Sequence, residues 1–390
     1  MRWVVFLLAS VATCAADLDA IRQTQAKLFA MRGRNPEVRG ANPELTVLKH
    51  QIRDWVESRI ANFPANGDVE SFSEELDSQL DSVKITKPDT SDDVMDLRLG
   101  EVDGVKLEHP KGDQSLLMFT SGVGVDRCGN DSSVYLYEWT NGGWTRQFEL
   151  EHDDYAAGKY GPIESVGSVE VSKPDEFRNR LVLVLGNSWG CASMWQGVSY
   201  SLFRIGGTPM TLLDGSDTVY MGSDDESYQG RLEPHGLLVE HRGWSKDVGV
   251  LIRRHVLHYQ VDGDSVRRVE PIALDPQDFV DEWLSDSWSE IKEWSESKLE
   301  KVHSTLEKAA VDGGFQLVQR CMDNASHWQI GFDFESGEYY FLVEQRGEHS
   351  FRMIDVTDER SSGCPGEGAP RTIENPLPSL FPPAKKPELF

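Results

Sequence analysis

Three similar strand-rich units follow one another between residues 103 and 270, and they restrict the possible folds of this chain more than any other feature. In each unit, large apolar residues alternate with polar ones and lead into a glycine-containing turn. Alternation that ends at Asn-Gly, Gly-Gly or Asp-Gly is typical of half-buried strands joined by tight hairpins. The sequence therefore predicts repeated antiparallel β-meanders.

The apolar runs locate the expected strands. They lie at 104–107, 115–120, 134–139 and 144–150 in the first unit, at 168–171, 180–185 and 198–204 in the second, and at 236–240, 248–252 and 255–261 in the third. Residues 328–356 offer a fourth sheet. Because closed propellers typically have four or more blades, we expect a propeller-like or an open multi-sheet arrangement.

Helical patterns flank the strands on both sides. Apolar residues recur every three or four positions near residues 45–60 and again from Phe279 to Leu306, which predicts amphipathic helices. Asn42 with Pro43 and Asp275 with Pro276 are cap and first-turn signals. The second stripe contains three tryptophans, whose helical spacing favours core packing over a sugar-stacking surface. The predicted fold class is mainly β with helical additions (α+β).

Changes in composition divide the chain into consecutive parts. We expect a signal peptide at 1–16, an N-terminal helical region at 17–83, an acidic linker at 84–96, repeated β-sheet units at 97–274, an amphipathic helical segment at 275–310, C-terminal β hairpins at 311–365 and a Pro-rich tail at 366–390.

The first residues have the pattern of a secretory signal. Arg2 precedes a short apolar run at residues 3–11, and small residues end at Ala16, which predicts cleavage there and a secreted or periplasmic protein. Lipid attachment at Cys14 is an alternative that Thr13 fits poorly. No later stretch is long and apolar enough for a transmembrane helix, so we expect none in the mature chain.

Four cysteines remain after that cleavage: Cys128, Cys191, Cys321 and Cys364. An even number in an exported protein favours two disulfides. Cys128 and Cys191 occupy matching loops and form the more natural pair, which leaves Cys321 for Cys364, although four cysteines allow three pairings. No CxxC or histidine cluster accompanies them, so we predict no metal and no cofactor.

The formal net charge of −26 narrows the choice of partners. Nucleic acids and anionic membranes bind clustered Lys and Arg, so the acidic balance argues against both.

One short motif suggests catalysis. Residues 186–190 read Gly-Asn-Ser-Trp-Gly and match the G-x-S-x-G nucleophile elbow, with Ser188 as the nucleophile. Histidines follow in a suitable order at His235, His241, His255 and His258. An elbow must open a helix, however, and here another strand follows almost at once. A serine hydrolase is therefore the alternative hypothesis.

Loops that follow the strands offer a binding surface instead. If the units pack side by side, their loops share one rim, and loops on a rigid scaffold commonly carry binding. The candidate binding residues on this rim are Trp189, Trp195, Trp244, Asp126 and Asp131. The preferred hypothesis is a binding module for an extracellular or periplasmic ligand, and a non-catalytic structural envelope protein is a further alternative. Asn130 and Asn324 begin glycosylation sequons, which matter only in a eukaryote.

Overall fold

The structure is a computed structural model that describes residues 3–31, 42–85, 98–125, 130–151, 165–188, 195–220, 228–247, 252–269, 273 and 275–364, without the side chains of residues 3–16, 42 and 188. The chain divides into two compact units, Met1–Ser216 and Asp217–Phe390. Among the described residues, the first unit contains two apolar cores and the second contains one.

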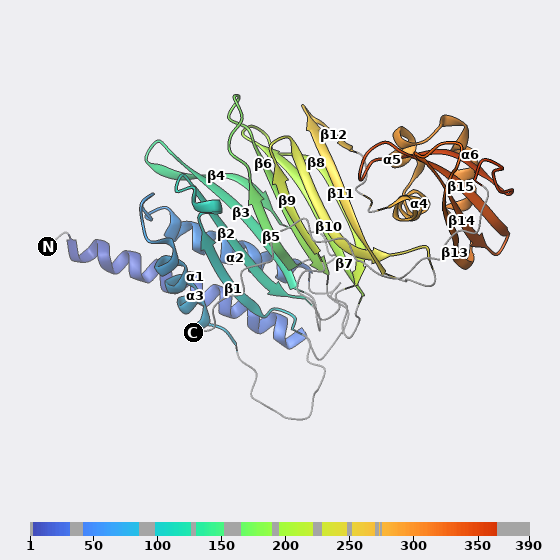
Figure 1. Cartoon of the computed structure of the whole chain (residues 1–390). Helices are drawn as coiled ribbons and strands as arrows, with labels where there is room; N and C mark the ends of the chain where they lie inside the picture. Colours follow the sequence, from blue (N-terminus) through green and yellow to red (C-terminus); the bar gives the residue numbers. More distant parts are fainter. Residues whose placement is uncertain are drawn as a thin grey trace, which may run out of the picture. The chain divides into compact units, whose positions relative to one another are not determined.

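Four sheets, each of four strands in sequence order, make up the β part of the described chain (Figure 1). Sheet A comprises β1 (Val102–Glu108), β2 (Leu116–Gly124), β3 (Asn130–Thr140) and β4 (Gly143–Leu150). Sheet B comprises β5 (Ser165–Val171), β6 (Arg180–Ser188), β7 (Trp195–Ile205) and β8 (Met210–Tyr220). Sheet C comprises β9 (Tyr228–Glu233), β10 (Gly236–Trp244), β11 (Ile252–Asp262) and β12 (Ser265–Arg268). Sheet D comprises β13 (Val311–Arg320), β14 (His327–Phe334), β15 (Gly337–Gln345) and β16 (Phe351–Thr357).

This arrangement confirms the prediction of a mainly β chain of repeated antiparallel meanders with helices at both ends. The first strands of sheets C and D differ from the prediction. β9 opens sheet C, so the run at 236–240 belongs to the second strand, and β13 opens sheet D ahead of the predicted hairpin. All six residues of β9 are half-buried, so its sequence carries no alternation to detect. The predicted strand at 248–252 falls largely on residues outside the description, and Ile252 begins β11.

Three helices cover one face of sheet A in the first unit (Figure 1). They are α1 (Trp3–Met31), α2 (Asn42–Ile60) and α3 (Val69–Asp81). The predicted apolar stripe of α2 is buried, with Trp55 1% exposed, and it joins Phe119 and Tyr135 of the sheet in one core. Burial of such side chains contributes about 1.5–3 kcal/mol each, which holds the helices on the sheet.

The opposite face of sheet A packs on sheet B, within the same unit. Leu116, Met118 and Leu136 of sheet A meet Val182 and Val184 of sheet B in a second apolar core. Sheet A is therefore covered on both faces, by helices on one side and by a sheet on the other.

Short helices cover sheet D in the second unit. α4 (Pro276–Ser285) begins at the predicted cap, where the Asp275 carboxylate accepts hydrogen bonds from the amides of Gln277 (2.8 Å) and Asp278 (2.9 Å). Further short turns follow: α5 (Trp288–Ile291), η3 (Lys292–Trp294), η4 (Ser297–Leu299) and α6 (Glu300–Leu306). Trp283 is fully buried and Trp294 is 8% exposed, so both are core residues rather than a stacking platform.

Cys321 and Cys364 form a disulfide across 43 positions of the sequence, as predicted for this pair. Cys128 and Cys191 lie outside the described residues, so their predicted bond stays a prediction. No helix in the described ranges combines the length and apolarity needed to cross a membrane.

Candidate functional site

Along the strands, the side chains between sheets A and B change from large and apolar to small and polar. The face of sheet A that meets sheet B carries Met118 on β2, followed by Thr120 and Gly122, and the paired strand β3 changes in the same direction from Val134 to Ser132. Small polar residues fill less space than Leu or Met. The two sheets therefore enclose a groove of about 570 Å³ at this end, which is within the range of ligand sites.

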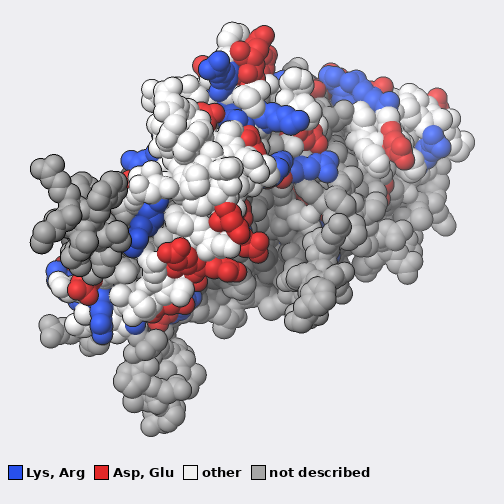
Figure 2. Space-filling model, turned by 90° about the vertical axis from the view of Figure 1, so that its left-hand side faces the viewer, with Lys and Arg blue, Asp and Glu red and all other residues white. Residues whose placement is uncertain are grey.

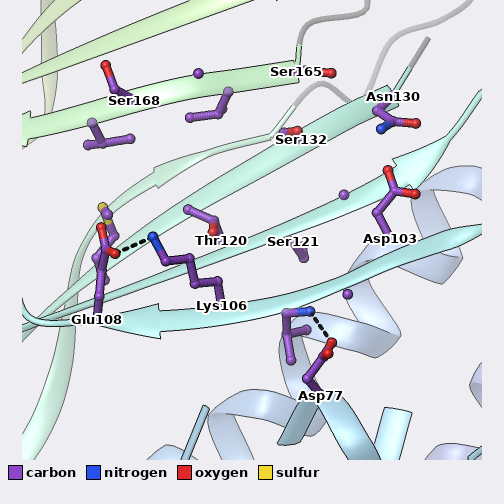
Figure 3. A pocket seen from close by; sticks show the side chains of 17 residues that line it. Asp77, Asp103, Lys106, Glu108, Thr120, Ser121, Asn130, Ser132, Ser165 and Ser168 are labelled. Carbon is purple, nitrogen blue, oxygen red and sulfur yellow. Dashed lines mark hydrogen bonds and ion pairs between the residues drawn. The ribbon is translucent and has the colours of Figure 1, made fainter. Parts of the chain in front are cut away.

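Two edge strands form the walls of this groove. Residues 103–106 of β1 and residues 165–169 of β5 line it consecutively, whereas β3 contributes only Asn130 and Ser132, which alternate. Successive residues of a strand point to opposite faces, so consecutive lining residues mean that the groove runs along the strand edges. The floor is the polar part of sheet A, and Figure 3 shows Ser165 and Ser168 of β5 across from Lys106 and Asp103.

Helix α3 closes the β1 edge with its side chains. The amide of Val105 donates to Asp77 Oδ1 at 3.1 Å, and the amide of Leu107 donates to Ser73 Oγ at 2.9 Å (Figure 3 shows the first bond). Gly104 permits this approach, because a Cβ there would lie 2.5 Å from Asp77 Oδ1 and its φ is +130°. These bonds satisfy amides that β1 would otherwise present to another strand.

The charges that line the groove are mostly paired. Lys106 forms an ion pair with Glu108, and Arg98 pairs with Asp103 and donates to Asn130 Oδ1 at 3.1 Å. Partial burial opposes the charge of Arg98, but Glu101 and Asp103 outweigh it and raise the pKa of its guanidinium. Asp77 accepts a hydrogen bond from the Val105 amide, and it has no ion-pair partner within the described residues, so it adds a negative charge to the lining.

The described residues among those predicted for a loop rim lie on three different strands, β3, β7 and β10. Asp131 is 1% exposed, and its carboxylate is 2.7 Å from the ammonium of Lys49, so it is part of a buried ion pair rather than of an open surface. Trp195 is half-buried at the start of β7 in the first unit, and Trp244 is 51% exposed at the end of β10 in the second. Asp126 and Trp189 lie outside the described residues.

Ser188 is the last residue of β6 and pairs with Gly197 of β7. The two strands are antiparallel hairpin partners, from Arg180 opposite Ile205 to Ser188 opposite Gly197, whereas a nucleophile elbow leads from a strand into a helix. The side chain of Ser188 is outside the description, and the candidate histidines belong to the other unit. Of these, His241 and His255 are buried, at 1% and 7% exposure.

The groove was missed by the sequence reasoning, although a signal for it is present. Both β2 and β3 change from large apolar to small polar residues toward the same end of the hairpin, at Thr120, Gly122, Ser132 and Asn130. Such a change in two paired strands indicates where a packed sheet opens.

Comparison with known proteins adds no assignment: no protein-family model matches the chain, and no curated protein matches its sequence.

Proposed function

We propose that this protein is a non-catalytic binding module and that the groove between sheets A and B is its ligand site. The observation that carries the proposal is the polar end of the inter-sheet contact, where Thr120, Ser132 and Ser168 present hydroxyl groups to an open space. Thr120 and Ser132 stand on paired strands of sheet A, which has apolar cores on both faces, and Ser168 stands on β5, which pairs with β6. A rigid scaffold of this kind holds hydrogen-bonding groups in place before the ligand arrives, which lowers the entropic cost of binding.

We place this function outside the cytoplasm. A disulfide joins Cys321 to Cys364, and disulfides persist mainly in oxidising compartments. The signal-like sequence of residues 1–16 supports the same location.

The ligand that we propose is not a nucleic acid. The chain carries 65 acidic and 39 basic residues, and on the face drawn in Figure 2 the Lys and Arg side chains lie interspersed with Asp and Glu. Phosphate backbones bind a continuous basic surface, because the affinity comes from neutralising many phosphates together.

A blocked groove tests the proposal. Ser168 is exposed on β5, so the indole of Ser168→Trp would fill the groove without entering a core. Ser265→Trp on β12 is the matched control, since Ser265 is also an exposed strand serine but does not line the groove. Wild type and both variants are applied to peptide and oligosaccharide arrays. We expect signals that Ser168→Trp loses and Ser265→Trp keeps. The proposal would be overturned if the array signals persisted in both variants, or if wild type and both variants gave no signal.

A fluorophosphonate probe tests the non-catalytic part separately. Such probes label activated serines, so we expect no label at Ser188 above that of heat-denatured protein. Labelling that Ser188→Ala abolishes would replace the binding module by a serine hydrolase.

A further inference from the structure

The two edge strands that border the groove differ in how their edges are occupied. On β1, the outward amides of Val105 and Leu107 already donate to side chains of α3. On β5, Val166, Ser168 and Val169 pair with β6 on one side, and within the described part of the chain no strand pairs with the other side. One wall of the groove is therefore closed to a further strand, and the other wall is open among the described residues.

The side chains of β5 also leave room for a partner strand. Gly167 and Ser168 are exposed, and a Cβ built on Gly167 would meet only the carbonyl oxygen of Leu185, at 3.6 Å. An unpaired strand edge offers a row of amide and carbonyl groups that an extended peptide can pair with.

We propose that β5 is a receptor strand, to which an extended peptide carrying Lys or Arg adds in the groove. This inference rests on the groove being a ligand site, and it names the ligand class. At about 3.3 Å per residue, residues 166–169 of β5, which line the groove, match a peptide segment of about four residues. A bulge between Val166 and Ser168 interrupts the regular ladder, which restricts pairing to a short segment and disfavours open-ended aggregation.

Charge selects a basic peptide. Lys106 and Arg98 form ion pairs with Glu108 and Asp103, whereas Asp77 has no cationic partner among the residues that the structure describes. The net charge of −26 adds a long-range attraction for cationic partners. A peptide strand on β5 directs alternate side chains toward the floor of the groove, so a Lys or Arg there approaches the Asp77 side.

Backbone pairing is tested with methylated peptides. The probe is a fluorescein-labelled peptide of alternating Thr and Lys, and its binding is followed by fluorescence anisotropy. Two isomers of this peptide carry N-methyl groups on alternate backbone amides. In the first isomer the odd-numbered residues are methylated, and in the second the even-numbered residues. A strand that pairs along one edge uses only one set. We expect one isomer to bind at least about fivefold more weakly than the parent, because two or more hydrogen bonds are lost, and the other to bind nearly as well.

Charge is tested with Asp77→Asn, which keeps an oxygen to accept from Val105 but removes the charge. We expect about two- to fivefold weaker binding of the Lys peptide, as for an exposed ion pair, and no binding of its Glu counterpart. Ser168→Trp should abolish binding and Ser265→Trp should not.

Two outcomes overturn the receptor-strand proposal and leave the groove as a ligand site. The first is equal binding of both methylated isomers and the parent, with loss in Ser168→Trp. The second is a groove ligand found on the arrays that is not a peptide. Peptide binding that survives Ser168→Trp would overturn both proposals.

Discussion

The ammonium of Lys49 on α2 lies 2.7 Å from the carboxylate of Asp131 on β3, and each side chain is 1% exposed. Two charges removed from water lose hydration free energy, which a close ion pair offsets. The pair joins the helical layer to sheet A beside the apolar core that these elements share.

Removing one member of this pair should therefore be costly. We expect Lys49→Met to lower the free energy of unfolding of the first unit by about 3–5 kcal/mol, because the Asp131 carboxylate stays buried without its cation. Adding Asp131→Asn should recover most of the loss. Urea unfolding followed by tryptophan fluorescence measures both.

Lys106→Met is the control for the loss of a lysine. Its side chain is 68% exposed and pairs with Glu108 at the surface, so we expect a change of at most about 1 kcal/mol. If Lys49→Met cost no more than Lys106→Met, the buried pair would not be important for stability.

The disulfide should stabilise the second unit. Closing 43 positions of chain removes conformational entropy from the unfolded state, which corresponds to about 4 kcal/mol. We expect Cys321→Ser/Cys364→Ser to lose hydrogen-exchange protection in β14 and β15, while β2 and β3 keep theirs. In the double variant, hydrogen-exchange protection of the second unit should also not change when reductant is added. Unchanged protection in β14 and β15 would contradict this prediction.

Local turn chemistry made the hairpins predictable. The turn between β3 and β4 places Asn141 at φ 52° and Gly142 at φ 85°, the positive values that an Asn-Gly pair adopts readily. The cap at Asp275 likewise involves only residues two and three positions further along the chain. Each of these features is decided by residues within a few positions of one another.

The groove and the buried ion pair depend instead on how elements that are distant in the sequence pack against one another. Lys49 and Asp131 are 82 positions apart, so no local pattern distinguishes Asp131 from an exposed loop residue. The groove requires β5 to lie across from β1, which the turn signals do not specify. Sequence reasoning therefore predicted the strand units and missed the site between them.

The closed edge of β1 gives a third prediction. We expect Asp77→Ala to lower the free energy of unfolding by about 1–3 kcal/mol, because the Val105 amide loses its acceptor, and to promote association at high concentration through the opened edge. Asp77→Asn should retain most of the stability, and Ser78→Ala, at an exposed position of α3, should have little effect. Urea unfolding and light scattering measure these changes. Association of Ser78→Ala to the same extent would argue against edge protection.

The final prediction concerns pH and His255, which is buried on β11. Burial, and next the charge of Arg253, hold the pKa of its imidazole below the usual 6.5. Nδ1 lies 3.0 Å from Arg253 Nη2 and Nε2 lies 3.1 Å from the carbonyl oxygen of Trp244, so the neutral ring accepts at Nδ1 and donates at Nε2. Glu282 Oε2, 3.3 Å from Nδ1, and the stacked ring of His241 complete its surroundings.

A lowered pKa in the folded state fixes the sign of the pH dependence. The contribution of His255 to stability is complete above about pH 6.5 and is lost as the pH falls toward the folded-state pKa, because the unfolded chain takes up the proton first. His303, whose pKa burial also lowers, acts in the same direction. Both histidines should therefore lower the urea midpoint of the second unit as the pH falls from 7.5 to 5.5, whereas Asp286, whose pKa burial raises, acts in the opposite direction.

Substitution of the histidine isolates its share of this change. His255→Asn keeps an oxygen that can accept from Arg253 but cannot titrate, so we expect a smaller fall in the midpoint between these pH values, whatever its stability at pH 7.5. A full wild-type fall in His255→Asn would mean that other groups carry the pH dependence, since only a group protonated differently in the folded and unfolded states can contribute to it.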